Sequence, residues 1–189
     1  MIRHGKKNGE NIAVEELEQI RQAGIPGVNE LLTSAPIFIH EGTALLRTRQ
    51  TVLALEEYLL KFPEKYLIAG RMMADANFGN SELFAEFFLD EKIIEEANRT
   101  NWFDAFCRCN PRFVRKIQER LIGALKETFY QMDDDQLVIT VGHTPSIEWL
   151  GFALDSNKIL PSDLQLKELT GMVITQNEKE IKISRTIGF

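Results

Sequence analysis

The chain has 189 residues, of which 44% are hydrophobic and 26% charged, and its net charge is -6. This composition is that of a globular protein rather than a disordered or fibrous one, and we expect residues 1–189 to form a single domain. The acidic balance argues against nucleic acid or a membrane surface as partner, because both favour a basic face. No apolar run approaches the roughly 20 residues that cross a bilayer, and no charged-then-apolar leader precedes Arg3. We therefore expect a soluble, cytoplasmic protein.

Only two residues precede the tripeptide Arg3-His4-Gly5. We expect His4 to end a short first strand and Gly5 to open a turn, since a residue without a Cβ lets an anion approach the backbone. Either this strand is shortened, or the recorded start lies downstream of the natural one. Lys6 and Lys7 follow directly, and they either attract an anionic substrate or form an exposed, solvated pair.

Apolar segments that predict strands alternate with segments of helical spacing. The expected strands are short and continuously apolar, which is typical of strands covered on both faces, as in a parallel sheet. They span residues 36–40, 66–69 and 136–141. The expected helices span residues 43–61, 81–99 and 114–132. This alternation predicts an α/β three-layer sandwich, in which helices flank a mostly parallel central sheet.

Two arginines lie close together in the first of these helices. Residues two apart on a helix point to different faces, so Arg47 and Arg49 cannot both enter one pocket. Each is a candidate for binding an anion, and the spacing alone does not choose between them. His40, at the end of an expected strand, could line the rim of such a pocket.

Cysteine and histidine are scarce. Cys107 and Cys109 are separated by one residue, which is too close for an ordinary disulfide framework and too few thiols for a four-thiolate metal site. We expect two reduced thiols, no bound metal and no cofactor.

A second histidine follows the strand expected at 136–141. It lies in the tetrapeptide Gly142-His143-Thr144-Pro145, where threonine is a good N-cap and proline suits the first helical position. This segment makes sense as a helix start without any catalytic role. A helix N-terminus is also an anion site, so the two interpretations are compatible.

The C-terminal part has a different pattern. Residues 172–175 and 181–184 flank the turn Asn177-Glu178-Lys179, and together they predict an antiparallel hairpin at the edge of the sheet.

The segments 3–5, 43–51 and 142–145, in this order, resemble the histidine phosphatase superfamily, also called phosphoglycerate mutase-like. Members place a full strand before the first histidine, and an arginine four residues before a threonine. Arg47 and Thr51 match that second pattern, so the resemblance favours Arg47 over Arg49.

The resemblance also implies roles for single residues. His4 would be the nucleophile and carry a phosphoryl group, while Arg3, Arg47 and His143 would bind the phosphoryl oxygens. Apart from the resemblance, four further residues are candidates for contact with the substrate; they are Gly5, Lys6, Lys7 and Thr144.

Departure of the leaving group needs a proton donor, which the nucleophile cannot be while it carries the phosphoryl group. Many family members place a glutamate three residues before an aromatic-glycine pair, and Asp75 takes that place before Phe78-Gly79. The resemblance therefore implies that Asp75 is the general acid, unless it only caps a turn. Glu82 and Glu148 are the alternatives.

These expectations describe a metal-independent phosphomonoester hydrolase that acts through a phosphohistidine. Its partner would be a small phosphorylated substrate or a phosphoprotein, and the sequence does not indicate an oligomeric state. A phosphoglycerate mutase-type phosphotransferase and an inactive phosphate-binding module are the alternatives. Mutases of the family generally have longer chains than this one.

Overall fold

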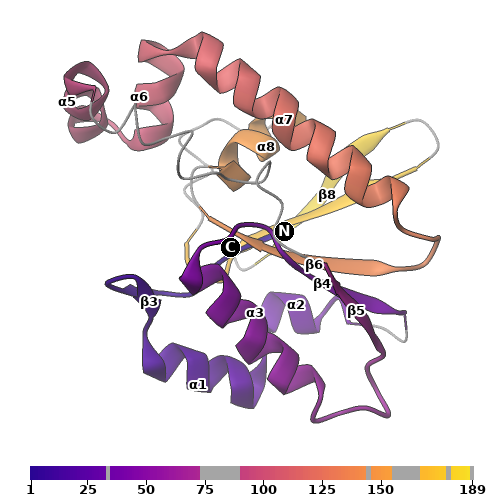
Figure 1. The fold of residues 1–189 in the computed structure, drawn as a ribbon. Helices are drawn as coiled ribbons and strands as arrows, with labels where there is room; N and C mark the ends of the chain where they lie inside the picture. The colour runs from indigo at the N-terminus through magenta and orange to yellow at the C-terminus, as the bar shows by residue number, and fades with distance from the viewer. Residues whose placement is uncertain (33–34, 73–89, 144–145, 155–166, 178–179, 188–189) are drawn as a thin grey trace.

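A computed structural model describes residues 1–32, 35–72, 90–143, 146–154, 167–177 and 180–187. Its main feature is a six-stranded sheet (Figure 1). In spatial order the strands are β5 (Ile68–Met72), β4 (Ile37–Glu41), β6 (Leu137–Gly142), β1 (Ile2–Arg3), β7 (Gly171–Gln176) and β8 (Ile181–Ile187). The pairs from β5 to β1 are parallel, and β7 pairs antiparallel with both β1 and β8. The expected parallel sheet with an antiparallel edge hairpin is thus confirmed.

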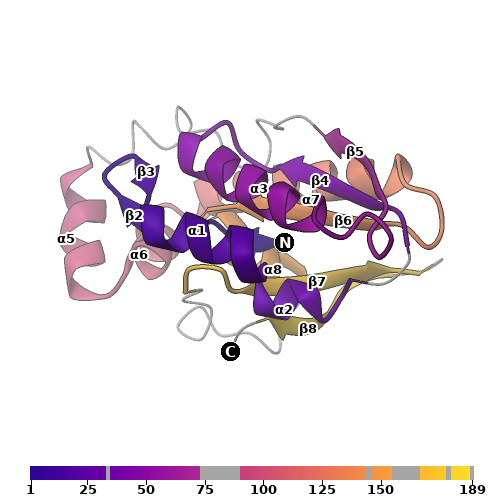
Figure 2. The same ribbon diagram turned by 90° about the horizontal axis from the view of Figure 1, so that it is seen from below.

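Helices cover the two faces of the sheet in separate groups (Figures 1 and 2). One face carries α1 (Val14–Ala23), α2 (Pro26–Asn29) and α3 (Leu46–Leu59). The other carries α5 (Glu91–Arg99), α6 (Trp102–Cys109), α7 (Pro111–Tyr130) and α8 (Ser146–Leu154). Each group buries its own apolar cluster, one around Ile39 and Leu55 and the other around Phe106 and Trp149. The three-layer sandwich is therefore confirmed.

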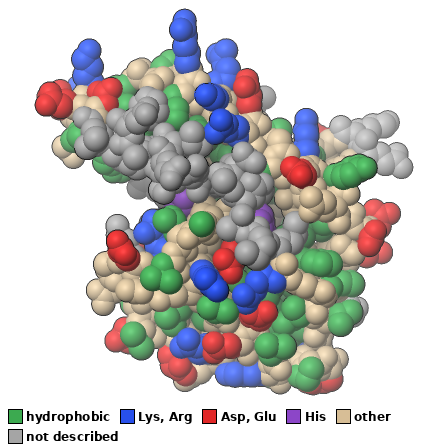
Figure 3. Space-filling view, viewed as in Figure 1, with side chains coloured by type: hydrophobic (Ala, Val, Ile, Leu, Met, Phe, Trp, Pro, Cys, Tyr) green, Lys and Arg blue, Asp and Glu red, His purple; other side chains and the backbone are tan. Residues whose placement is uncertain are grey.

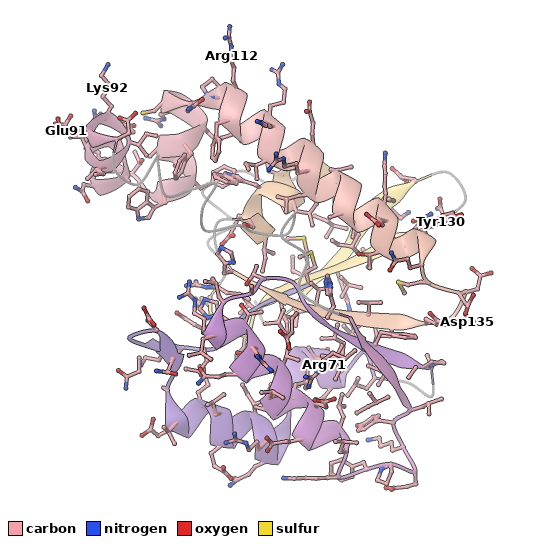
Figure 4. The ribbon with its side chains drawn as sticks, in the orientation of Figure 1. Arg71, Glu91, Lys92, Arg112, Tyr130 and Asp135 are labelled. Atoms are coloured by element: carbon pink, nitrogen blue, oxygen red, sulfur yellow. The ribbon has the colours of Figure 1, made fainter. Side chains whose placement is uncertain are left out.

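Local sequence determines where α7, the longest of the described helices, begins. The Asn110 side chain accepts a hydrogen bond from the Phe113 amide at 3.2 Å, and Pro111 occupies the first turn, so α7 begins three residues before the expected position. The helix passes Arg112 near its start and ends at Tyr130, and Asp135, with a φ of 64°, lies in the turn that leads to β6 (Figure 4).

One expected strand, at residues 66–69, is displaced toward the C-terminus. Tyr66 instead packs its ring against Tyr58 and Phe62, with centroids 6.5 and 6.1 Å apart, and β5 continues through Arg71 to Met72. Arg71 pairs there with Glu56 on α3 and with Glu41, which lies 3.8 Å away (Figure 4). An edge strand tolerates this cation because one of its sides is open to solvent.

Two further elements differ from the sequence expectation at their boundaries. Helix α3 begins at Leu46 rather than at residue 43. Of the helix expected at 81–99, the described part is α5, from Glu91 to Arg99, and residues 81–89 lie outside the described ranges.

A small hairpin follows the first strand of the sheet. Its strands β2 (Lys7–Asn8) and β3 (Asn11–Ile12) pair antiparallel and are joined through Gly9, whose φ of 63° favours glycine. The Lys6 carbonyl accepts a bond from the Ala13 amide at 2.8 Å, which closes the hairpin onto the start of α1.

Strand β1 has only two residues, yet it lies in the middle of the sheet. Its register places Ile2 opposite Val141 and Arg3 opposite Gly142. The His4 amide donates to the Gly142 carbonyl at 3.0 Å, and the Arg3 amide donates to the Thr170 carbonyl at 2.8 Å. These bonds hold the two ends of the chain together. Within the described ranges, no helix is both long and apolar enough to cross a membrane.

The close approach of β7 to β1 yields a stability prediction. A Cβ on Gly171 would overlap the Met1 carbonyl oxygen and lie 2.7 Å from the Ile2 Cα, so Gly171→Ala forces backbone apart. We expect a loss of about 1–3 kcal/mol in the free energy of unfolding, measured by urea titration. The control Gly123→Ala meets no atom within 4 Å on α7 and should stabilise by about 0.5–1 kcal/mol. An unchanged stability in Gly171→Ala would contradict the packing described here.

Candidate active site

The carboxyl ends of the parallel strands bring the two histidines together. His4 directly follows β1, and His143 directly follows β6, whose residue Gly142 is the register partner of Arg3. Strand β4 ends at the same edge and leads into α3, which carries Arg47. In open α/β sheets this edge is where ligands bind. Figure 3 shows small areas of histidine surface on this face of the molecule, with lysine or arginine side chains below them.

The His4 ring is buried and held at both nitrogens. Its Nδ1 lies 2.6 Å from the Gly5 carbonyl oxygen, and its Nε2 lies 2.9 Å from Arg47 Nε. Because an arginine N–H can only donate, Nε2 must be the acceptor, and the proton of a neutral ring must then be on Nδ1. The contacts therefore assign one tautomer, in which Nδ1–H donates to Gly5 and the lone pair of Nε2 points toward Arg47.

A single threonine connects the loop that follows His4 to helix α3. The Thr51 hydroxyl donates to the Arg47 carbonyl at 2.9 Å, one helical turn earlier, and accepts from the Gly5 amide at 3.2 Å. Thr43 and Thr48, both fully buried, share a hydroxyl–hydroxyl bond of 2.9 Å where the helix begins. The side chain of Arg49, in contrast, is exposed. The structure thus brings Arg47, and not Arg49, to the histidines.

Burial and neighbouring cations disfavour the charged form of both histidines. Burial lowers the pKa of His4 to about 4; the bond to Gly5 opposes this shift, Arg47 and Arg3 add to it, and Glu168 opposes it. Burial also lowers the pKa of His143 to about 4, assisted by Arg47, His4 and Arg3. Arg47 is hydrogen-bonded to His4, Arg3 precedes His4 in the chain, and His143 follows the neighbouring strand, so the four side chains converge. The two rings are thus neutral in positively charged surroundings, a combination typical of functional sites.

His143 differs from His4 in how it is held. Among the described residues its Nδ1 is buried and has no hydrogen-bond partner. Within the described part of the chain that nitrogen is thus left without a protein partner, whereas both nitrogens of His4 are engaged.

Three carboxylates that the sequence did not single out lie near these cations or near the loop that follows His4. Glu168 Oε1 lies 3.5 Å from Arg3 Nη2, and Glu10 raises the pKa of the Arg47 guanidinium against the lowering by burial. Glu16, on α1, accepts a hydrogen bond from the Lys6 amide. Burial raises the pKa of Glu16, with a further rise from Glu168 and opposition from the Lys6 amide. No local pattern marks these residues, since only the packing of distant segments brings them here.

Gly5 is needed for close packing of protein atoms. A Cβ at this position would lie 2.5 Å from Glu16 Oε2 and 3.2 Å from Ile12 Cγ2. The sequence suggested a different reason, the approach of an anion to the backbone. The described contacts make the carboxylate of Glu16 the group that closely approaches Gly5.

The remaining predicted residues have varied surroundings. The Lys6 side chain is exposed, and the side chain of Lys7 lies outside the described part. His40 is buried within β4, where its Nδ1 lies 3.3 Å from the Thr140 hydroxyl, and Glu41 rather than His40 ends the strand. Glu148 is buried in the first turn of α8. Three candidates lie outside the described ranges; they are Asp75, Glu82 and Thr144.

Both cysteines are free thiols. Cys107 is half-buried with its pKa raised to about 11, mainly by burial, and neither cysteine is in a disulfide. Within the described ranges, no group of three or more histidine, cysteine or acidic side chains could hold a metal ion.

Similarity to known proteins is found only among solved structures. No model of a known protein family matches the sequence, and no curated protein matches it. Among solved structures, the chain is similar to one from Agrobacterium tumefaciens described as SixA, a candidate phosphohistidine phosphatase. The two chains are 14% identical, the match covers 99% of this chain and 95% of the other, and the TM-score is 0.48. At this identity the likeness concerns the fold and not the chemistry.

The convergence of the cations predicts the titration of both histidines. Removing a nearby positive charge favours protonation, so Arg47→Met should raise the pKa of His4 and of His143 from about 4 toward 6.5. Arg49→Met, which removes an exposed charge from the same helix, should leave both unchanged. NMR titration of the ring resonances measures these values. Equal pKa values in wild type and Arg47→Met would show that the guanidinium does not face the histidines.

The same shifts determine the sign of the pH dependence of folding. Unfolded histidines bind protons below about pH 6.5, whereas the folded ones bind them only near pH 4. The unfolded state therefore binds more protons between these values, and both histidines contribute a loss of stability as the pH falls through that range.

Proposed function

We propose that this chain is a member of the histidine phosphatase superfamily that hydrolyses phosphomonoesters through a phosphohistidine on His4. The observation that carries the proposal is the fixed tautomer of His4. Its Nδ1 is 2.6 Å from a carbonyl oxygen, and its Nε2 faces the Arg47 guanidinium with an unprotonated lone pair. A neutral imidazole held in this way is a competent nucleophile at neutral pH.

In the first step, the Nε2 lone pair forms a bond to phosphorus as the bond to the ester oxygen breaks. The imidazole then carries a positive charge, and the bond from Nδ1–H to the Gly5 carbonyl stabilises it. Arg3, Arg47 and His143 stabilise the equatorial phosphoryl oxygens, whose charge is the main demand of such a transition state.

Arg47 must exchange partners before this attack. In the structure its Nε donates, at 2.9 Å, to the same lone pair that would attack phosphorus. A phosphoryl oxygen is a stronger acceptor than neutral imidazole because it is charged. Binding of the substrate therefore draws the guanidinium from Nε2 to the phosphate, and one movement both binds the anion and uncovers the nucleophile.

The leaving oxygen needs a proton, and we propose Asp75 as its donor from the resemblance stated above. The same carboxylate, now ionised, would take a proton from the water that attacks the phosphohistidine. Inorganic phosphate is then released, and His4 returns to its free form. The substrate would be a small phosphorylated molecule or a phosphorylated protein side chain.

Hydrolysis of p-nitrophenyl phosphate in the presence of EDTA tests the proposal. We expect wild-type turnover that falls by about a thousandfold or more in His4→Ala, because loss of a nucleophile removes the covalent route. Arg49→Met is the matched control and should keep wild-type activity. Turnover that survives His4→Ala would refute the mechanism, and a wild type that binds phosphate without turnover would instead indicate a binding module.

A further inference from the structure

One face of helix α7 carries a cluster of exposed cations, which we call the basic face. Its members all lie in the N-terminal half of the helix; they are Arg112, Arg115, Lys116 and Arg120. Arg112, Lys116 and Arg120 follow one another at steps of four residues, so they form a row about 12 Å long. Figure 3 shows lysine or arginine side chains that project from the upper part of the molecule, and Figure 4 shows Arg112 pointing away from the ribbon. The basic face is therefore open to a partner.

The four cations of the basic face make no ion pair with any other described residue, although the chain has more acidic than basic side chains. Glu119 lies on the same part of α7, but it is not within ion-pair distance of any of the four. Most arginines elsewhere in the described ranges are paired with a glutamate; they are Arg3, Arg21, Arg71, Arg99, Arg108 and Arg185. The basic face thus differs from the surrounding surface in that its charges are not compensated.

This arrangement of charges is unfavourable for the helix itself. Like charges four residues apart on a helix repel each other, and Arg112 with Lys116 and Lys116 with Arg120 are two such pairs. The first turn of α7 has no acidic side chain, and the N-terminal end of the helix dipole disfavours positive charge. Carboxylates that approach from outside the helix would relieve both effects. The basic face therefore favours an acidic ligand.

A groove with several apolar residues in its lining begins at the edge of the basic face. It has a volume of about 360 Å³ and lies between α7 and α8. Its lining residues are Arg115, Gln118, Glu119, Ile122, Phe152 and Ala153. Arg115 belongs to both the groove and the basic face, so an acidic segment that lies on the basic face could place an apolar side chain in the groove.

The size of the basic face and the groove beside it select among anionic partners. A row of about 12 Å spans two turns of an α-helix, so acidic side chains four residues apart on a partner helix match the spacing of Arg112, Lys116 and Arg120. A nucleic acid has no apolar side chain for the groove. The net charge of -6 also disfavours approach of the whole chain to an extended polyanion or an anionic membrane. A short acidic helix with an apolar side fits all of these features.

We propose that the basic face binds an acidic amphipathic helix of a partner protein. Its carboxylates would pair with Arg112, Lys116 and Arg120, and one of its apolar side chains would enter the groove beside Arg115. The interaction combines charge complementarity with an apolar anchor, as in other surfaces that recognise amphipathic helices. None of these residues belongs to the proposed phosphatase site, so the test does not depend on turnover.

The probe is a synthetic helical peptide of about 18 residues, because shorter isolated helices are marginally stable. Glutamates four residues apart form one face of this peptide, leucines form the adjoining face, and alanines fill the other positions. Fluorescence anisotropy of the labelled peptide measures its Kd. We expect the same peptide with glutamine in place of each glutamate to bind at least about tenfold more weakly. Raising the salt to about 0.5 M should also weaken binding of the glutamate peptide.

Variants of the protein locate the binding surface. Lys116→Gln combined with Arg120→Gln removes two charges from the basic face and should weaken binding of the glutamate peptide about fivefold or more. The matched control, Arg49→Gln combined with Lys182→Gln, removes the same charge from exposed residues of α3 and β8 and should leave the Kd unchanged. Ala153→Trp, at an exposed position of α8, fills the groove and should weaken binding as well.

The proposal is overturned if the glutamate peptide does not bind at about 1 mM, if the glutamine peptide binds equally well, or if the Lys116→Gln and Arg120→Gln variant binds like the wild type. Binding to oligothymidine, or to vesicles of equal parts phosphatidylcholine and phosphatidylserine, provides a further test. If wild type binds either of these more tightly than the peptide and the same variant loses that binding, the basic face serves a different polyanion. A dimer in sedimentation velocity that this variant abolishes would assign the face to a second copy of the chain. Either result would overturn the proposal.

Discussion

The hydrogen bond between Arg47 Nε and His4 Nε2, 2.9 Å long, is the interaction on which the site depends. It assigns the ring tautomer, because an arginine N–H can only donate and the proton must then be on Nδ1. It also joins the first strand of the sheet to α3, and Thr51 reinforces that junction by bonding to both the Gly5 amide and the Arg47 carbonyl. The geometry of the proposed nucleophile is thus a consequence of how α3 packs on the sheet.

Burial of the two histidines beside arginines costs free energy, which the rest of the fold must offset. Each histidine pKa falls from 6.5 to about 4, which corresponds to about 3 kcal/mol against charging either ring. Burial and the neighbouring Arg3 lower the pKa of the Arg47 guanidinium, Glu10 opposes this lowering, and Glu168 lies 3.5 Å from Arg3. An anion such as a phosphoryl group would compensate these cations, so the electrostatics that disfavour a charged histidine favour binding of an anion. The acidic net charge of the chain therefore says little about the electrostatic potential around the two histidines, because that potential depends on which charged side chains lie nearby.

Elements with a clear local pattern could be predicted from the sequence. The continuous apolar runs at β4 and β6 and the apolar stripe of α7 indicate the layers, and the strand-end rule places His4 beside His143. Features that depend on distant segments could not be predicted. Glu16 and Glu168 reach the site from α1 and from the segment before β7, with no periodicity to mark them. Likewise, β5 holds Arg71 because Glu41 and Glu56 pair with it, which residue spacing does not reveal. Whether Asp75 is the acid stays a prediction, since it lies outside the described ranges.

The central claim is that the phosphoryl group passes through Nε2 of His4, and trapping of the covalent intermediate tests it most directly. The protein is mixed with a phosphomonoester, quenched in alkali within milliseconds and digested, and the peptides are analysed by mass spectrometry and by ³¹P NMR. We predict one acid-labile, alkali-stable phosphoryl group on the peptide that contains His4, attached at Nε2 because Nδ1 is engaged by Gly5. Turnover without any phosphorylated His4, or phosphorylation at Nδ1, would contradict the account.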